Sequence, residues 1–440
     1  MPISATPRPS GSSGNAPAVT NGKALAVVTT IFFMWGFLTC LNDILIPHLK
    51  AVFELNYAKA MLVQFTFFGT YFLMSLPAGR LVAALGYKKG IVAGLVIAGI
   101  GALGFWPAAE LRVYGAFLGA LFVLASGITV LQVAANPYVA LLGPEQTSSS
   151  RLTLAQALNS LGTAIAPIFG GMLILSNTVK SADDIAALPA AEQLAYRAAE
   201  AQAVQGPYVG LAVALVLLAL FVFLFRLPAL SDATEQADQG HHHSYLDALR
   251  KRHLLLGVLG IFFYVGAEVS IGSFLVNYLS MPNIGGFSEQ QATHYVSAYW
   301  TMAMIGRFAG SALLARFSPS RLLAIFALVN VGLLVTTMLS SGSVALYSVV
   351  AIGLFNSIMF PTTFSLALEG LGNLTSKGSG LLCMAIVGGA VMPLVQAFFA
   401  DRIGLLPSFA VPLVCYLYII WFGARGYRAD QSASAPAGTP

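Results

Sequence analysis

Charged residues are scarce in this chain of 440 residues. Asp, Glu, Lys and Arg make up only 9% of it, whereas a soluble domain carries about 25%. Hydrophobic residues account for 57% of the sequence, and the mean hydropathy is +0.79. This shortage of charge excludes an ordinary soluble domain, and we therefore expect an integral membrane protein.

Recognisable enzyme motifs are lacking as well. The chain has no GxxxxGK[ST] loop, so it lacks the signature of an ATP-driven pump, and it has no HExxH, GxSxG or SxxK stretch. His48, His253 and His294 lie at the edges of apolar runs, and the remaining three histidines form the run 241–243. No histidine is therefore placed as a general base inside the membrane. We predict that the protein is not an enzyme and has neither catalytic nor metal-binding residues.

Cysteine is also rare, and basic residues do not cluster. Cys40, Cys383 and Cys415 lie in apolar runs without a CxxC spacing, which predicts buried thiols rather than disulfides. The formal net charge is +5, but Lys and Arg are scattered, so nucleic acid is not an expected partner. The ends of the chain, 1–23 and 426–440, contain many small residues and prolines, which predicts disordered tails.

Long apolar runs are abundant and define the architecture. We predict an all-α membrane protein with twelve transmembrane helices in two six-helix halves, 24–227 and 254–425, joined by a cytoplasmic linker at 228–253. The polar segment 177–206 is predicted to be a short surface helix in an extended loop. The twelve expected spans are 24–49, 59–84, 90–109, 112–142, 151–176, 207–227, 254–281, 291–316, 321–340, 343–368, 378–400 and 404–425.

The distribution of basic residues predicts the orientation of these spans. With the N-terminus inside, sixteen of the 22 Lys and Arg residues fall on the cytoplasmic side, counting Arg307, which lies within a span. The positive-inside rule therefore places both termini in the cytoplasm. The six on the other side are Lys50, Lys59, Arg112, Lys180, Arg197 and Arg402.

An internal repeat is expected from this twofold organisation. The stretch "GRLVAALGYKKG" (79–90) ends the second span, and "GSALLARFSPSR" (310–321) ends the eighth. Both place small residues in a helix and then a tight basic turn. Such repeats are common in secondary transporters, which bind substrate near the membrane midplane between the repeats.

Two acidic residues within apolar runs are candidates for binding a coupling ion. Glu268 lies near the middle of the seventh span, and Asp43 lies near the outer end of the first. Acids inside membrane spans are costly and usually mark ion or substrate pathways. Structural alternatives are a protonated or helix-paired Glu268 and an interfacial anchor at Asp43. Trp35, Thr39 and Asp43 recur every four residues and so share one face of a helix.

Amide side chains form the next set of candidates. Gln132 and Asn136 are four residues apart in the fourth span, and Gln156 and Asn159 are three apart in the fifth, so each pair shares a helix face. Such amides either bind substrate or tie helices together. Gln64, Asn330 and Asn356 are single midspan amides, for which the helix tie is the commoner role. Asn277 ranks low as a substrate-binding candidate, because it is nine residues from Glu268 and so half a turn out of phase with it on an ideal helix. Asn42, beside Asp43, is a further substrate-binding candidate.

The side chains in these spans are suited to a neutral polyhydroxyl compound. Amides and carboxylates offer donors and acceptors that match vicinal hydroxyl groups. Aromatic rings, Trp35 foremost, can stack on the apolar face of a sugar, although aromatics in spans more often pack against lipid or helices. A strongly anionic substrate is not expected, because Arg307 is the single candidate for a basic residue at midspan.

Several stretches between about residues 30 and 425 resemble the major facilitator superfamily, and specifically the bacterial fucose–galactose–glucose:proton symporter family. The resemblance implies alternating access, a central sugar site, a role for Asp43 of "LND" in proton coupling and sugar binding, and sugar contacts from Gln156 and Asn159. Fucose-transporting relatives read "LETAANP" where this chain reads "LQVAANP", so Gln132 favours the glucose/galactose branch. The carrying stretches include "FFMWGFLTCLNDILIPHLKAVFELNY", "LQVAANPYVALLGPE", "RLTLAQALNSLGTAIAPIFGG" and "GAEVSIGSFLVNY".

Together these features predict a monomeric importer of a hexose, of the glucose/galactose type, in the bacterial inner membrane. The expected partners are a small-molecule sugar and membrane lipid. No cofactor is expected beyond the coupling ion, a proton or sodium, held by Asp43 and Glu268. Transport of N-acetylglucosamine, mannose or fucose remains open, as does a non-transporting sugar receptor that signals through the 228–253 loop. A simple channel would leave both acids without a coupling role.

Overall fold

The computed structural model describes residues 20–53, 57–111, 113–173, 187–228 and 244–428. Within these ranges, some side chains lie outside the description, namely those of residues 39, 41–53, 57–61, 64, 167–173, 289 and 290, and several between 194 and 204. The described part of the chain is helical and contains no strand.

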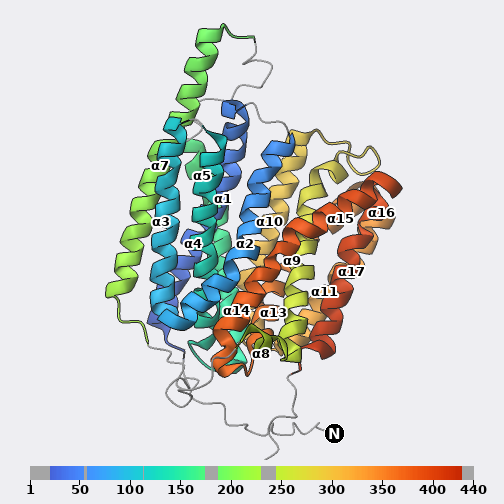
Figure 1. Ribbon diagram of the computed structural model, residues 1–440. Coiled ribbons are helices and arrows are strands. Elements are labelled where there is room, and N and C mark those ends of the chain that lie inside the picture. Colours follow the sequence, from blue (N-terminus) through green and yellow to red (C-terminus); the bar gives the residue numbers. More distant parts are fainter. Residues whose placement is uncertain (1–19, 54–56, 112, 174–186, 229–243, 429–440) are drawn as a thin grey trace, which may run out of the picture.

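Each of the twelve predicted spans coincides with one helix or a run of consecutive helices (Figure 1). Nine helical stretches in the described ranges are long and apolar enough to cross a membrane. The N-terminal half contains α1 (Gly22–Phe53), α2 (Tyr57–Leu85), α3 (Tyr87–Leu111), α4 (Tyr114–Leu141), η1 (Glu145–Thr147), α5 (Ser148–Leu173) and α7 (Ala190–Leu224). The C-terminal half contains α8 (Tyr245–Leu249), α9 (Arg252–Leu279), α10 (Glu289–Leu314), α11 (Pro319–Leu339), α12 (Gly342–Asn356), α13 (Met359–Leu368), η2 (Gly372–Leu374), α14 (Thr375–Met384), η3 (Ala385–Val387), α15 (Gly388–Ile403), α16 (Leu405–Ser408), α17 (Ala410–Trp421) and the π-helix η4 (Phe422–Gly426).

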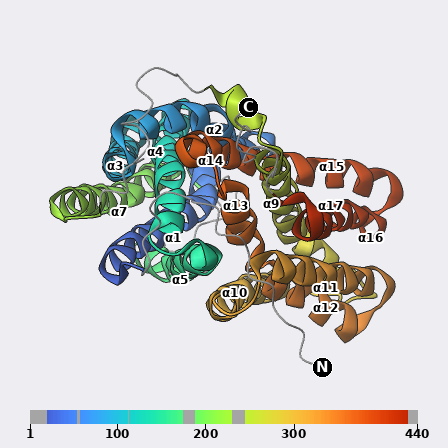
Figure 2. The ribbon, with the colours of Figure 1, turned by 90° about the horizontal axis from the view of Figure 1, so that it is seen from below.

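The two halves lie side by side and meet along a small set of helices. Viewed along the bundle, α3, α4 and α7 lie on one side and α11, α15 and α17 on the other, while α14 lies beside α2 and α4 (Figure 2). At the join, α5 contacts α10 and α13, while α14 contacts α2 and α4. Residues that come together there are therefore contributed by opposite halves of the sequence.

Helix α7 differs from the expectation for segment 177–206. Residues 190–206, predicted to form a separate surface helix, are instead the first part of α7, which continues through Pro207 to Leu224. A helix of 35 residues is about 52 Å long at 1.5 Å per residue, so it exceeds the ~30 Å hydrocarbon core. The excess extends beyond the bundle (Figure 1).

Two glycines mark the same contact in both halves and reveal an internal repeat. A Cβ atom on Gly162 of α5 would lie 2.1 Å from the carbonyl oxygen of Phe33 in α1. A Cβ atom on Gly388 of α15 would lie 2.0 Å from the carbonyl oxygen of Phe262 in α9. Only glycine permits such an approach of helix backbones. The first and fifth spans of each half therefore cross in the same way.

The loop between α4 and α5 is held by a buried arginine. The Arg151 guanidinium donates to the carbonyl oxygens of Val139 (3.1 Å), Gly143 (3.2 Å) and Pro144 (2.9 Å), and to the Thr147 hydroxyl (2.6 Å). The last carbonyls of a helix have no intrahelical donor. Arg151 supplies donors to them and thereby fixes where α5 begins.

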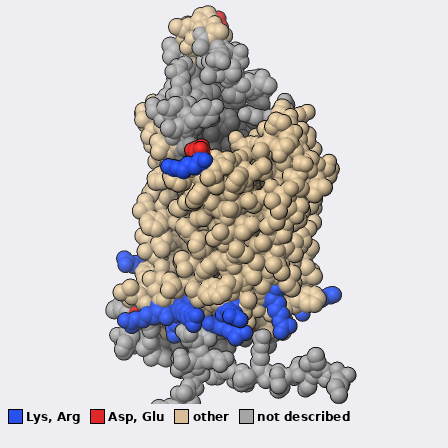
Figure 3. Space-filling view, turned by 90° about the vertical axis from the view of Figure 1, so that its right-hand side faces the viewer, with Lys and Arg blue, Asp and Glu red and all other residues tan. Residues whose placement is uncertain are grey.

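Lysine and arginine side chains gather at one end of the bundle. On the face that Figure 3 shows, a basic band crosses the end of the bundle at which α8 lies. There Lys88 Nζ donates to the carbonyl oxygen of Phe223 (2.9 Å), and the Arg80 guanidinium lies 5.8 Å from the centre of the Tyr245 ring. The described chain also begins and ends at this side, because α1 starts and η4 finishes there (Figure 1).

Candidate functional site

The amides of α4 are buried and only partly used by the protein. Gln132 is 3% exposed and Asn136 is fully buried. Gln132 Nε2 donates to the Tyr71 hydroxyl of α2, but its Oε1 has no hydrogen-bond partner among the described residues. Both polar side-chain atoms of Asn136 lack a described partner as well. Buried amides normally find partners, so this face of α4 has unused donors and acceptors.

The two amides of α5 have different environments. Asn159 Nδ2 donates to the carbonyl oxygen of Phe32 (2.9 Å), which ties α5 to α1. The Thr163 hydroxyl, one turn further along α5, donates to the carbonyl oxygen of Gly36, which also lies in α1 (3.2 Å). Gln156 is 6% exposed, and its Nε2 has no partner among the described groups. Gln156 is therefore the member of this pair with a donor available for a ligand.

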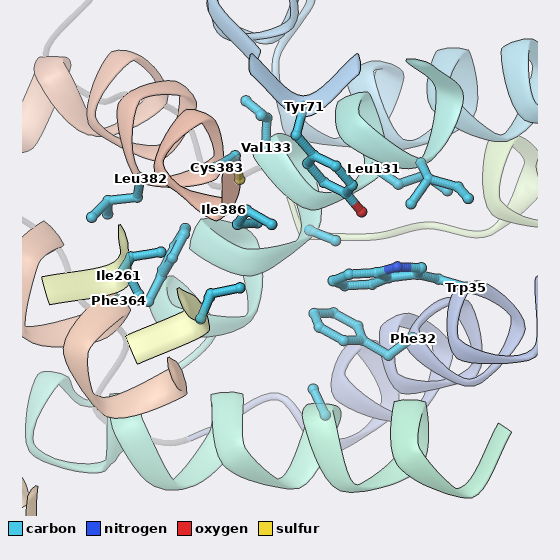
Figure 4. Packing of buried hydrophobic residues seen from close by; sticks show 14 of the residues in the cluster. Phe32, Trp35, Tyr71, Leu131, Val133, Ile261, Phe364, Leu382, Cys383 and Ile386 are labelled. Atoms are coloured by element: carbon cyan, nitrogen blue, oxygen red, sulfur yellow. The ribbon is translucent and has the colours of Figure 1, made fainter. Parts of the chain in front are cut away.

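Aromatic rings adjoin the amides of the N-terminal half. Trp35 is 7% exposed, and its ring centre lies 5.3 Å from that of Phe32. The Tyr71 hydroxyl, which accepts from Gln132, points toward the Trp35 ring (Figure 4). The ring centres of Phe67 and Tyr71 are 5.4 Å apart. These contacts bring α1, α2 and α4 together around one partly polar, partly aromatic region.

Glu268 of α9 lies opposite, in the C-terminal half, and has a basic neighbour. Its side chain is 12% exposed, and Oε1 lies 3.8 Å from Nη2 of Arg307 in α10. The Arg307 Nη1 donates to the Ser160 hydroxyl of α5. Sequence reasoning noted Arg307 as a midspan base but did not pair it with Glu268, although both were visible as charges in apolar runs.

Asn356 is saturated by contacts within its own half. Its Nδ2 donates to the Tyr299 hydroxyl (2.8 Å), and its Oδ1 accepts from Asn330 Nδ2 (2.8 Å) and the Tyr416 hydroxyl (2.7 Å). The Tyr264 hydroxyl donates to its carbonyl oxygen (3.0 Å). This asparagine therefore ties together α9, α10, α11, α12 and α17.

The tyrosine contacts of Asn356 and Gln132 are related by the internal repeat. Each amide lies five residues before a proline, Asn356 in the tenth span and Gln132 in the fourth. Each donates to a tyrosine of the second span of its own half, Tyr299 and Tyr71 respectively. Of these two related amides, Gln132 keeps its side-chain oxygen without a described partner, whereas the oxygen of Asn356 accepts two hydrogen bonds.

The remaining candidates fall outside this region or outside the description. Asn277 lies two residues before the end of α9, and its side chain is exposed. The structure therefore does not bring Asn277 together with the buried amides. Asn42 and Asp43 lie in α1 and Gln64 lies in α2, but their side chains lie outside the described part of the structure.

A set of serines joins the two halves between this region and the basic end of the bundle. The hydroxyl oxygens of Ser149 (α5) and Ser365 (α13) are 2.6 Å apart. Ser150 Oγ donates to the carbonyl oxygen of Ser311 in α10 (2.8 Å), and Ser311 Oγ donates back to that of Ser150 (3.0 Å). Ser379 of α14 donates to a carbonyl of α4 (2.9 Å). Nothing in the sequence distinguished these serines from others in helices.

Comparisons with known proteins agree with this architecture. Residues 25–386 match the Major Facilitator Superfamily. A glucose/galactose transporter of Brucella abortus biovar 1 (strain 9-941) is 54% identical over 415 residues, which cover 93% of this chain and 95% of the relative. An L-fucose-proton symporter of Escherichia coli (strain K12) is 39% identical over 401 residues, covering 90% and 91%.

Solved structures show the same fold. The crystal structure of a Major Facilitator Superfamily transporter, FucP, in the outward conformation aligns with a TM-score of 0.84 and 36% sequence identity, covering 91% of this chain and 97% of that one. The superfamily match extends over most of the chain, and the relatives align with it almost from end to end. This chain belongs to the major facilitator superfamily.

Proposed function

We propose that the protein is a secondary active transporter that imports a hexose, of the glucose/galactose type, by proton symport. The observation that carries the proposal is the set of buried amide groups without hydrogen-bond partners among the described residues, in a chain 54% identical to a glucose/galactose transporter. A buried polar group that lacks a hydrogen bond costs about 1–3 kcal/mol. A ligand rich in hydroxyl groups would supply the missing bonds.

The sugar site is proposed to lie on the N-terminal side of the join. Gln132, Asn136 and Gln156 provide unpartnered acceptors and donors among the described groups. Trp35 supplies an aromatic surface beside them, and Asn159 fixes α5 against α1 so that Gln156 is positioned. Neutral groups and a ring suit an uncharged sugar, whose hydroxyls lie beside apolar C–H faces.

Alternating access is proposed to begin from an arrangement closed toward the cytoplasm. The serine contacts between the halves lie on the side of the basic band, which the positive-inside rule assigns to the cytoplasm. The same rule supports cytoplasmic termini, and the bacterial sources of the relatives support a location in the bacterial inner membrane. The likeness to an outward conformation agrees with this assignment. Breaking the serine contacts would then open the site inward.

Ion coupling is assigned to Asp43. An acid in a membrane span is costly, and its retention is explained when it binds and releases an ion during the cycle. Coupling requires that ion and sugar each favour binding of the other. A relative named as an L-fucose-proton symporter favours the proton over sodium as the coupling ion.

Transport in proteoliposomes tests the proposal. Labelled glucose, galactose, fucose and N-acetylglucosamine are each offered under an inward proton or sodium gradient, with the Asp43→Asn variant beside the wild type. We expect glucose or galactose to accumulate with the proton gradient. Asp43→Asn should abolish accumulation but preserve sugar counterflow, which needs no gradient.

Each other outcome contradicts a defined part of the proposal. Accumulation of fucose alone would refute the glucose/galactose assignment, and accumulation driven only by sodium would refute proton coupling. Accumulation unchanged in Asp43→Asn would remove that acid from the mechanism. Absence of counterflow for all four sugars in wild-type protein would refute hexose transport itself, as expected for a receptor.

A further inference from the structure

Arg307 is a largely buried cation for which sugar symport provides no role. It lies seven residues before the end of α10, about 10 Å along the helix from that end. Its side chain is 13% exposed. The guanidinium is 3.8 Å from Glu268 in its own half and donates to Ser160 in the other half. One side chain therefore links an acid of α9 to a hydroxyl of α5.

The charge of Arg307 needs a counter-charge at every stage of transport. A guanidinium does not lose its proton in proteins, and an unpaired charge at this depth is costly. Of the acidic side chains that the structure describes, Glu268 is the one that forms an ion pair with Arg307. Among the described residues, the hydrogen bond of Arg307 that crosses to the other half goes to the Ser160 hydroxyl, and the hydroxyls of Tyr264, Tyr299 and Tyr416 lie near Glu268.

We propose that Glu268 and Arg307 form a fixed, charge-neutral pair that joins the halves through Ser160, and that Glu268 is the counter-charge of Arg307 rather than a carrier of the coupling ion. This inference rests on the proposed sugar symport and assigns the ion to Asp43 alone. Arg307 is then a positioning residue, because it holds α10 against α5 beside the amide of Gln156.

The pair and a coupling role for Glu268 have different charge balances. If Glu268 took up and released a proton in each cycle, the buried pair would alternate between neutral and a net charge of +1. The Arg307 cation would then lack its counter-charge during part of every cycle. A fixed pair avoids this state. Removing one partner of a buried ion pair is strongly destabilising, whereas replacing both is often nearly neutral.

This difference predicts rescue by a second neutral substitution. Glu268→Gln and Arg307→Gln are prepared singly and together, and Arg307→Lys serves as the charge-conserving control. Each single neutral variant is expected to lower the yield of monodisperse protein on size-exclusion chromatography and to reduce glucose or galactose counterflow about ten-fold or more. The double variant should recover both to within about three-fold of wild type. Arg307→Lys should lose less than Arg307→Gln.

Accumulation under a proton gradient separates the two roles of Glu268. In the fixed-pair arrangement, the double variant accumulates sugar as well as exchanging it. If the double variant exchanges sugar but cannot accumulate it, Glu268 carries the ion and the inference is overturned. It is equally overturned if the double variant is recovered no better than the worse single variant, or if the single variants behave like wild type. Should wild type move no sugar, the proposed function fails, whereas the yields still test the pair.

The bridge to Ser160 is tested separately. Ser160→Ala removes the contact across the halves and leaves the charge pair intact. Ser126→Ala is the matched control, because that hydroxyl donates to a carbonyl of its own helix, α4 (2.7 Å). We expect Ser160→Ala to change the maximal counterflow rate about two- to ten-fold and the KM for sugar much less. An unchanged rate, or an equal effect of Ser126→Ala, would contradict the bridge.

Discussion

Replacing Asn136 by alanine is expected to weaken sugar binding without destabilising the protein. Asn136 is fully buried, yet its amide has no hydrogen-bond partner among the described residues. If two bonds to sugar hydroxyls are lost, at about 0.5–1.5 kcal/mol each, the binding free energy falls by about 1–3 kcal/mol. The dissociation constant then rises about 5- to 150-fold. The folded protein loses no described bond, so its melting temperature should not fall.

Asn356 provides a matched control of the same residue type and burial. It is also fully buried, but its side chain is bonded to Tyr299, Asn330 and Tyr416. Alanine at this position would strand three buried polar groups at about 1–3 kcal/mol each, a total of about 3 kcal/mol or more. Asn356→Ala is therefore expected to lower the melting temperature clearly, with binding affected through the loss of folded protein.

The two variants are compared by thermal unfolding in detergent and by sugar binding in the same preparation. Sugar should also raise the melting temperature of wild type, since a ligand that binds only the folded state stabilises it. Asn136→Ala should greatly reduce this sugar-dependent increase, while its melting temperature without sugar should equal that of wild type. The reasoning is refuted if Asn136→Ala destabilises the protein as much as Asn356→Ala, or if it binds sugar as tightly as wild type.

Three further predictions concern the fold and the joined halves. Gly388→Ala should destabilise the protein by about 1–3 kcal/mol, because its Cβ would lie against the carbonyl oxygen of Phe262. Gly119→Ala is the control and should be neutral or stabilising, because Gly119 lies at an open position of α4. Equal melting temperatures of the two variants would contradict the steric argument. Ser149 and Ser365, whose hydroxyls are 2.6 Å apart, are both replaced by cysteine, and the resulting disulfide should stop counterflow until a reductant is added. Transport by the cross-linked protein would refute the proposal that α5 and α13 must separate during transport. Arg151→Gln should lower the melting temperature by removing donors from the end of α4, and an unchanged value would show that the loop holds without them.

Hydropathy alone predicted the helices of this protein, because the membrane imposes a local rule. A spanning segment must be apolar and must satisfy its own backbone, so each span can be recognised without knowledge of its neighbours. The extension of α7 over residues 190–206 was missed for the same reason. Those residues are polar, and their continuation of the helix depends on length and surroundings rather than on hydropathy.

The polar residues in the spans were visible in the sequence, but their roles were not. Gln156 and Asn159 look equivalent by spacing, yet only the packing of α5 against α1 brings Asn159 to the Phe32 carbonyl. A single amide such as Asn356 was expected more often to tie helices together, but only the structure shows that three other helices supply its partners. Periodicity shows which face of a helix a side chain occupies, but not what lies opposite.

Contacts between different helices depended entirely on tertiary structure. Glu268 and Arg307 are separated by 39 positions, and Arg307 and Ser160 by 147. The serines that join α5 to α10 and α13 have no distinguishing sequence pattern. The sequence by itself determined that this is a membrane protein, where its helices lie and which polar residues are costly to place in the membrane, because these follow from composition and local spacing. The folded chain decided which of those residues are paired and which remain available, because pairing requires atoms from distant segments to meet.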